Sequence, residues 1–232
     1  MSQKFKYFMS NFWEVLFSIP YSIYFNFRVL PFRVAMRCPI IISYHIKTKG
    51  LSRKNFIFED CNSLKSASIR IGFDGSGTIY RDSKKGMINI EGDGKIIIKG
   101  IIGLSQAVII EACYGTIVFG KNFRCNTSCI IYCKESEVTF GDDVVLGWHV
   151  TVKNGDGHYV IEDGVTKPRC APIHIGNHVW LCSYSDILKG VTIGDNSVVA
   201  YRSLVVKGTD EASVLYGGAP AKIIRKNINW QE

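Results

Sequence analysis

The chain has 232 residues, of which 47% are hydrophobic and 21% charged, and its net charge is +8. This length fits one good-sized domain, or one domain with an appendage, and excludes an array of several domains. The positive charge belongs to residues 1–54, which hold nine Lys and Arg against one acid, Glu14. The rest of the chain carries nineteen basic and nineteen acidic side chains, so its charge cannot select an acidic or a neutral binding partner.

Residues 1–54 predict a basic, aromatic helical segment. Its apolar side chains recur at spacings of three and four, which makes one apolar stripe. Pro20 is expected to bend or divide the helix, and Pro31 is expected to end it. The stripe consists of Phe5, Phe8, Phe12, Leu16, Ile19, Ile23, Phe27 and Leu30.

This segment is not predicted to cross a membrane. Its longest uncharged run, Val15 to Phe27, has thirteen residues, whereas a transmembrane helix needs about 20. Glu14 interrupts the apolar stretch and no small-residue cleavage site follows, so a signal peptide is not predicted either. The apolar stripe also disfavours nucleic-acid binding as the purpose of the basic residues.

A repeat of six residues organises the later part of the chain. Every sixth position is aliphatic, and a small or β-branched residue follows four positions later. Six is the period neither of a helix nor of a half-exposed strand, so it predicts a solenoid in which one hexapeptide forms one flat face. The aliphatic positions are Ile175, Leu181, Ile187, Ile193, Val199 and Val205, and the small ones are Val179, Ser185, Val191, Ser197 and Ser203.

Aliphatic pairs followed by glycine extend this pattern toward the N-terminus, from about Ser68 to Lys207. The step from Ile98 to Phe119 and on to Phe140 is twenty-one positions, and from Ile175 to Ile193 it is eighteen. The longer step from Phe140 to Ile175, thirty-five positions, predicts an extruded loop at 153–172, and such loops are usually functional. The predicted divisions are therefore 1–54, the solenoid 55–207 and a short C-terminal tail, 208–232.

Two interpretations of residues 1–54 remain open. The segment is either a cap that hides the open first coil of the solenoid, or an amphipathic helix on the cytoplasmic face of a membrane. The two are compatible if the outer face of the helix is the basic one.

The eight cysteines are predicted to be reduced thiols of a cytosolic protein. They include no Cys-x-x-Cys pair. Cys125, Cys129 and Cys133 follow a spacing of four that suits inward-facing small residues in strands rather than a zinc site.

The segment IGNHVWLCSYSDILKGVTIGDNSVVAYRSLVVKG, followed by YGGAPAKIIRKNINW, resembles the hexapeptide-repeat acyltransferases. Within them it is most similar to bacterial O-acetyltransferases of sugars and of surface polysaccharides such as capsule and lipopolysaccharide. The similarity is strong over residues 117–230. It implies an all-β left-handed parallel β-helix with three faces per coil, a homotrimer, and acetyl-CoA as the donor without a metal.

The resemblance also implies catalytic residues. His158, in the Asp-Gly-His of the extruded loop, occupies the place of the family's general base, and imidazole suits proton removal from a hydroxyl near neutral pH. Asp156 is the local candidate to orient it. The backbone N–H of Ser183 matches the position that faces the developing oxyanion. A solvated loop histidine is the alternative for His158.

Four residues are expected to bind the acceptor, namely Trp148, His149, Asn154 and Trp180. His149 departs from the family, which has Asn or Asp there, and Trp180 lies in a Val-Trp-Leu that matches the family's Val-Trp-Ile. A core tryptophan is the alternative for Trp180. Four of the five histidines fall within thirty residues, but their spacing is not that of the related zinc enzymes, so a metal is not predicted.

The donor groove is where the chain departs most from the family. Small residues usually line it, whereas Tyr201 and Arg202 stand here. These either block the pantetheine arm, or replace backbone contacts by a stacking ring and a phosphate-binding guanidinium. The residues expected to bind coenzyme A are Cys182, Ser183, Ala200, Tyr201, Arg202, Lys207, Ala219, Lys222 and Arg225.

The sequence therefore predicts a cytoplasmic acetyl-CoA-dependent O-acetyltransferase that acts on a sugar hydroxyl of a bacterial surface polysaccharide or its precursor. Two alternatives stay open. One is an N-acetyltransferase acting on an aminosugar nucleotide, and the other is an inactive trimeric scaffold whose donor groove is closed.

Overall fold

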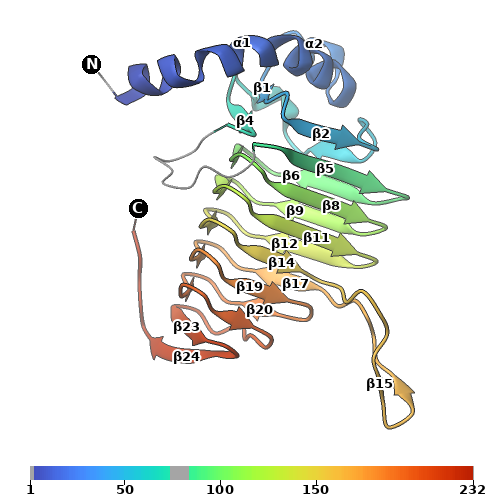
Figure 1. The fold of residues 1–232 in the computed structure, drawn as a ribbon, viewed down its shortest axis with the longest axis vertical. Coiled ribbons are helices and arrows are strands. Elements are labelled where there is room, and N and C mark those ends of the chain that lie inside the picture. The colour runs from blue at the N-terminus through green and yellow to red at the C-terminus, as the bar shows by residue number, and fades with distance from the viewer. Residues whose placement is uncertain (1–2, 74–83, 232) are drawn as a thin grey trace.

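The chain folds into a stack of coils whose strands form three parallel sheets (Figure 1). The computed structural model describes residues 3–73 and 84–231, with side chains from Phe12 onward. Successive strands fall in sheets A, B and C in turn, so each coil contributes one strand to each sheet. This arrangement and the hexapeptide repeat fit the predicted left-handed β-helix.

Sheet A has nine strands, sheet B seven and sheet C six. Sheet A contains β1 (Ile40–Ile42), β4 (Ile69–Ile71), β7 (Ile102–Leu104), β10 (Phe123–Cys125), β13 (Val145–Leu146), β18 (Trp180–Leu181), β21 (Val198–Val199), β23 (Val214–Gly218) and β24 (Ala221–Lys226). Sheet B contains β2 (Ile46–Lys49), β5 (Gly86–Glu91), β8 (Ile109–Cys113), β11 (Ile130–Lys134), β14 (Thr151–Lys153), β19 (Asp186–Leu188) and β22 (Leu204–Val205). Sheet C contains β3 (Phe56–Phe58), β6 (Lys95–Ile98), β9 (Thr116–Phe119), β12 (Glu137–Phe140), β17 (Ile173–Ile175) and β20 (Thr192–Ile193).

The register of sheet C confirms the spacing predicted between successive coils. Ile98 pairs with Phe119, Phe119 with Phe140, Phe140 with Ile175, and Ile175 with Ile193. Equivalent side chains therefore stack directly above one another, and Phe119 and Phe140 lie with nearly parallel rings 5.5 Å apart.

The six-residue period also predicted the core correctly. All six aliphatic positions from Ile175 to Val205 are buried, with at most 3% of their surface exposed, and the five small positions are buried as well. Cys125, Cys129 and Cys133 are buried in the same interior, which confirms the inward orientation expected from their spacing. All eight cysteines are free thiols.

The predicted start of the coils, near Ser68, and the division at residue 55 were wrong. The first coil is β1, β2 and β3, and Ile40 already pairs in parallel with Ile69 of the next coil. The step between these two partners is twenty-nine positions, longer than a regular coil, so the coil-to-coil spacing used in the prediction does not reach the first coil. The connection between β4 and β5 includes residues 74–83, which lie outside the described part of the chain.

Two helices cover the first coil, α1 (Gln3–Val29) and the short α2 (Phe32–Ala35), and a single 3₁₀ turn, η1 (Cys61–Ser63), follows β3. α1 lies across the top of the stack in Figure 1, against β1. Pro31 separates the two helices as predicted. Pro20 lies inside α1 without dividing it.

The buried face of α1 is largely polar. Glu14, Ser18, Ser22 and Asn26 recur every four residues, and each is at most 7% exposed. Asn26 bonds both the N–H and the carbonyl of Ile40, and the Ser22 hydroxyl bonds both backbone groups of Ile42. These side chains satisfy the open backbone edge of β1, which would otherwise be an unpaired strand edge.

The apolar stripe does not face the core as a whole. Phe12, Leu16, Ile19 and Ile23 are each between 37% and 46% exposed, while Leu30 at the end of the stripe is buried. Phe5 and Phe8 lie in α1, but their side chains fall outside the described residues. The outer face of the helix is therefore apolar and not basic. The cap and the membrane interpretations were expected to be compatible only with a basic outer face, and that condition was wrong.

A two-stranded hairpin projects from the fifth coil, with β15 (Ile161–Glu162) and β16 (Val165–Thr166) paired antiparallel. Figure 1 shows it standing well clear of the stack. The hairpin forms the tip of the predicted loop, which leaves sheet B after β14 and returns to sheet C at β17. Its apolar side chains Val160, Ile161 and Val165 are more than half exposed.

Candidate functional site

One edge of the stack, between sheets A and B, gathers most of the predicted binding residues. Three consecutive coils turn there, at 147–149, 182–184 and 200–202, and we call these nine residues the turn column. Backbone hydrogen bonds fix its register, since Tyr184 N–H donates to the carbonyl of Trp148 and Arg202 N–H to that of Ser183. The column therefore unites residues predicted for the acceptor with residues predicted for the donor.

The last residue of each of these turns has a left-handed backbone. The φ angles are +54° at His149, +61° at Tyr184 and +55° at Arg202. The rings of His149 and Tyr184 stack 4.8 Å apart, and the Arg202 guanidinium lies over the rings of both Tyr184 and Tyr201. Tyr201 and Arg202, both exposed, thus cover the end of the column rather than fill the coil interior.

The backbone N–H of Ser183 is the predicted oxyanion donor. Among the described residues, none accepts a hydrogen bond from this N–H. Gly147, one coil earlier, lies so close that a Cβ there would stand 2.5 Å from the Ser183 nitrogen. The Ser183 hydroxyl is engaged elsewhere, because it accepts a 3.0 Å hydrogen bond from Trp148 N–H. Glycine at 147 therefore keeps space beside an N–H that can still donate.

The second group of predicted residues lies at another edge, between sheets B and C. His158 is exposed in the loop that follows β14. The Asp156 carboxylate forms an ion pair with Lys189 at 2.5 Å, and Asp156 N–H donates to the carbonyl of Arg169. In this conformation Asp156 therefore binds Lys189, and its predicted role toward His158 stays a prediction.

Asn154 is not available to an acceptor, contrary to its predicted role. Its side chain is fully buried. The amide oxygen accepts from Lys134 N–H at 2.7 Å, and the amide nitrogen donates to the Lys134 carbonyl at 3.2 Å. Asn154 thus fastens the start of the extruded loop to the coil before it.

The two edges lie on opposite sides of sheet B within one chain. β14 of sheet B separates His149 from Asn154. Five residues of extended chain span about 17 Å, and the loop projects outward from the stack rather than back across sheet B (Figure 1). The structure therefore unites the turn column and leaves His158 at a different edge.

The remaining donor residues divide between these edges. β23 ends at the edge of the turn column, because Ala200 N–H donates to the carbonyl of Tyr216. The turn that contains Ala219 follows there, and Lys222 and Arg225 stand exposed on β24. Lys207 follows β22 and lies at the edge of the loop instead. Burial raises the pKa of the Cys182 thiol to about 11, so this thiol is neutral at physiological pH.

Trp180 lies on sheet A and is 39% exposed. The C-terminal arm covers part of this surface, since the Trp230 ring stacks on His178 at 4.2 Å and approaches Trp180 to 5.9 Å. The Trp230 indole N–H donates to the carbonyl of His178. Sequence reasoning missed Trp230, because no spacing connects residues so far apart in the chain.

Sequence reasoning also missed Tyr184 and Lys189. His149, Tyr184 and Arg202 are separated by the same steps as successive coils. The spacing alone could therefore have predicted that Tyr184 lies between the other two. Lys189 follows Leu188, the register partner of Lys153, and so stands next to the start of the loop. Its pairing with Asp156 depends on how the loop folds, which no spacing reports.

The histidines are distributed over the fold rather than gathered. His149 is in the turn column, His174 bonds Thr139 on sheet C, and His178 bonds Asn196 at the turn between sheets C and A. Within residues 3–73 and 84–231 no group of three or more His, Cys, Asp or Glu is arranged to hold a metal ion.

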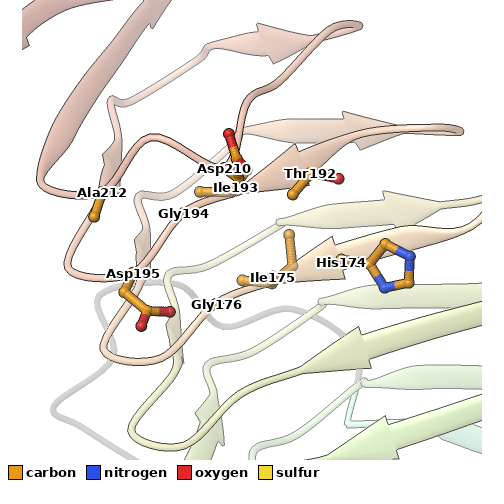
Figure 2. A pocket seen from close by; sticks show the side chains of 9 residues that line it. All are labelled: His174, Ile175, Gly176, Thr192, Ile193, Gly194, Asp195, Asp210 and Ala212. Carbon is orange, nitrogen blue, oxygen red and sulfur yellow. The ribbon is translucent and has the colours of Figure 1, made fainter.

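A shallow depression on sheet C, of about 310 Å³, lies between β17 and β20 (Figure 2). Asp195 and Asp210 line it, and Figure 2 shows His174 at its opposite end. Two carboxylates at one end make this depression unsuitable for the phosphates of a nucleotide. It is also separate from the turn column, so the candidate site remains at the two edges.

Comparison with known proteins gives a repeat match and several relatives. Residues 172–207 match the family model "Bacterial transferase hexapeptide (six repeats)". The galactoside O-acetyltransferase of Escherichia coli K12 is 38% identical over 116 residues, which are 49% of this chain and 56% of that protein. A putative acetyltransferase of Staphylococcus aureus Mu50 is 32% identical over 131 residues, or 54% of this chain and 63% of that protein. The chain thus spans 56% and 63% of the length of these two curated relatives.

A solved structure shares the fold. The acetyltransferase NeuO, described as specific for polySia, superposes with a TM-score of 0.53 at 20% identity, covering 81% of this chain and 84% of that one. This likeness concerns the fold alone. The comparisons thus show the bacterial transferase hexapeptide repeat over residues 172–207 and a fold shared with a solved acetyltransferase.

Proposed function

We propose that this protein transfers an acetyl group from acetyl-CoA to a hydroxyl of a sugar in a bacterial surface glycan or its precursor. The observation that carries the proposal is the turn column. There the Ser183 N–H, which has no acceptor among the described residues, lies beside Gly147, and Ser183 belongs to the stretch that matches the bacterial transferase hexapeptide repeat. The curated relatives support acetyl transfer, and the galactoside enzyme among them is named for a sugar acceptor.

In the proposed reaction, the His158 imidazole removes the proton from the acceptor hydroxyl as its oxygen attacks the thioester carbon. The carbonyl oxygen becomes an oxyanion that accepts a hydrogen bond from the Ser183 N–H. The tetrahedral intermediate then collapses, and the carbon–sulfur bond breaks. The proton held by His158 passes to the departing CoA thiolate, which yields free CoA and the acetylated sugar.

This reaction needs two chains if His158 and Ser183 act together, because they lie at different edges of one stack. We propose that the loop of one subunit reaches the turn column of the next in a homotrimer. The exposed apolar side chains of the projecting hairpin support this arrangement, since Ile161 is 68% and Val165 60% exposed in the single chain. Such side chains are typical of a surface that another subunit covers.

The donor groove distinguishes an enzyme from a scaffold, because Tyr201 and Arg202 stand where coenzyme A would bind. Exposed Tyr201 and Arg202 leave the coil interior unobstructed, so they can contact coenzyme A by stacking and by binding a phosphate. If they exclude it instead, the protein is a scaffold. An N-acetyltransferase would use the same donor groove with an amine as acceptor. For either enzyme we propose a location in the cytoplasm, where thiols stay reduced and acetyl-CoA is available.

The decisive experiment measures thiol release from acetyl-CoA with a panel of sugars and aminosugars, for the wild type and for His158→Ala. Loss of a general base lowers the rate by about 10² to 10⁴, while calorimetry should show unchanged donor binding. His45→Ala is the matched control, because half-buried His45 lies between β1 and β2 in the first coil, several coils from the turn column and the loop. Thiol release that persists in His158→Ala would remove His158 from the mechanism, and lack of donor binding by the wild type would support the scaffold.

The shared site is tested by mixing inactive chains. Gly147→Ala places a Cβ against the Ser183 nitrogen and should block the oxyanion position. Co-expressed His158→Ala and Gly147→Ala chains should regain part of the activity, because one intact loop meets one intact turn column. A mixture as inactive as each variant alone, although both chains co-assemble, would place the site within a single chain.

A further inference from the structure

The outer face of α1 is an unusually apolar surface, which we call the cap face. It consists of residues at spacings of three and four that point away from the coils, and α2 continues it. Trp13 is 65% exposed, Phe17 62% and Phe32 64%. The cap face comprises Trp13, Leu16, Phe17, Ile23, Tyr24, Phe32 and Met36, each at least 41% exposed.

This face exists because the buried side of α1 is committed to the edge of β1. The polar side chains that would normally face solvent bond the backbone of β1 instead, so the aromatic residues are left outside. Most of a helix's outward surface is polar when water is its neighbour. Both α1 and α2 instead expose apolar side chains on their outward surface. This indicates that something other than water covers the cap face.

Positive charge borders the cap face. Arg33 and Arg37 are exposed on and beside α2, and exposed Arg53 donates to the carbonyl of Phe27 near the end of α1. Glu14 is the one acidic residue in the range 1–54, and it is buried in an ion pair with Lys84. The described surface around the cap face is thus basic and aromatic, with no carboxylate from this segment to neutralise it.

We infer that the cap face binds the surface of an anionic lipid bilayer, with α1 lying in the plane of the interface. Aromatic side chains at the headgroup level and basic residues beside them are the features of such helices. No helix among the described residues is long and apolar enough to cross a membrane. A second copy fits less well, because two cap faces in contact would bring the same basic borders together, and residues 12–54 offer no exposed acid to compensate them.

The docked arrangement fixes the height of the candidate site. α1 lies across the first coil, and sheet A continues from β1 through β4, β7 and β10 to β13, where the turn column begins. Four spacings of about 4.8 Å separate β13 from β1, and the thickness of α1 adds about 10 Å, so that column lies roughly 30 Å from the membrane surface. This consequence, unlike the docking itself, rests on the proposed function, and it would suit an acceptor glycan carried on a lipid.

The experiment is co-sedimentation of the full chain with vesicles of phosphatidylcholine and phosphatidylglycerol, and with vesicles of phosphatidylcholine alone. We expect the wild type to sediment with the anionic vesicles and to be released as salt rises from about 0.1 to 0.5 M. Trp13→Asp with Phe17→Asp should weaken binding at least about tenfold. Each of Arg33→Gln and Arg37→Gln should weaken it about fivefold.

Ile224→Asp is the matched control, because Ile224 is 57% exposed on β24 at the far end of the stack and should not affect sedimentation. Circular dichroism and thiol release with a soluble sugar check the fold and the separate catalytic proposal. Equal sedimentation of the wild type and the double variant would overturn the inference. The inference would also be overturned if the wild type did not sediment with vesicles and the double variant had a lower molar mass by light scattering than the wild type. That outcome would assign the cap face to a contact with a second copy.

Discussion

The later coils and the N-terminal cap bury opposite kinds of side chain. Between Ile175 and Val205 the buried positions are aliphatic or small, and the outward positions are polar or half-exposed. In α1 the face against the coils carries the polar Glu14, Ser18, Ser22 and Asn26 before the apolar Phe25 and Val29 at its C-terminal end, and the outward face carries aromatic and aliphatic residues. The two regions share one chain and one interior, yet over Glu14 to Asn26 the cap buries mainly polar side chains where the coils bury apolar ones.

The difference lies in what each region packs against. A coil packs its side chains against those of the next coil, so apolar residues go inward and the hydrophobic effect sets the pattern. α1 packs against a strand edge whose N–H and carbonyl groups need partners. A buried surface is therefore apolar only where its neighbour has no unpaired hydrogen-bonding groups.

The largest effect is expected from placing a polar residue in the coils. Ile187→Asn buries an amide where the interior offers aliphatic neighbours, and should lower the free energy of unfolding by about 4 kcal/mol. Urea denaturation followed by circular dichroism measures it. Val206→Asn, at a position 48% exposed, is the control and should change stability by less than about 0.5 kcal/mol. Equal midpoints for the two variants would contradict the assignment of the interior.

The inverse change in the cap should also destabilise. Asn26→Leu is conservative by the apolar pattern, but it leaves the N–H and carbonyl of Ile40 without partners. We expect a loss of about 2 to 3 kcal/mol. Ile23→Asn, on the outer side, should leave the free energy of unfolding in solution almost unchanged. Urea denaturation measures both variants. A stabilised Asn26→Leu protein would show that apolar burial governs the cap after all.

One substitution should have opposite signs in the two regions. Ser22→Ala removes both hydrogen bonds to Ile42 and should cost about 1 kcal/mol. The hydroxyl of buried Ser203 has no hydrogen-bond partner among the described residues. Ser203→Ala should therefore be neutral or stabilising by up to about 1 kcal/mol. Thermal unfolding of both variants measures this, and a costly Ser203→Ala would reveal a partner for that hydroxyl.

The smallest effect concerns the thiols of the coils. Burial raises the pKa of Cys182 to about 11 and that of Cys133 to about 12. Because the folded pKa is raised, each buried thiol contributes stability below the unfolded pKa of about 9, and this contribution is lost as the pH rises toward 11 and 12. Iodoacetamide at pH 8, followed by mass spectrometry, should alkylate Cys182 about a hundredfold more slowly in folded than in unfolded protein. Equal rates would contradict the burial.

The coils were predictable because their neighbours are other copies of the same motif. Once Ile175 faces inward, the constraint repeats at each coil, and the spacings counted along the sequence reproduced the register residue by residue. The first coil was missed since the step from Ile40 to its partner Ile69 in the next coil is twenty-nine positions, far from the regular coil step. The orientation of α1 was missed because its partner is a backbone edge, which side-chain hydrophobicity does not report.

The site was predictable only in part, for a related reason. The turn column follows from the register, so residues such as His149 and Arg202 could be related by counting. The pairing of Asp156 with Lys189 and the burial of Asn154 depend on the path of an irregular loop. The stacking of Trp230 on His178 joins the C-terminal arm to a coil by a contact with no periodic signature.

The hydrogen bonds between α1 and β1 also bear on whether molecules stay separate. A bare first coil would expose parallel strand edges, which can template pairing with another chain and lead to open-ended fibres. Asn26 and Ser22 occupy that edge with side chains that cannot propagate a strand. α1 thereby prevents the stack from growing by addition of further chains. Loss of α1 is expected to cause aggregation before it affects the coils that carry the candidate site.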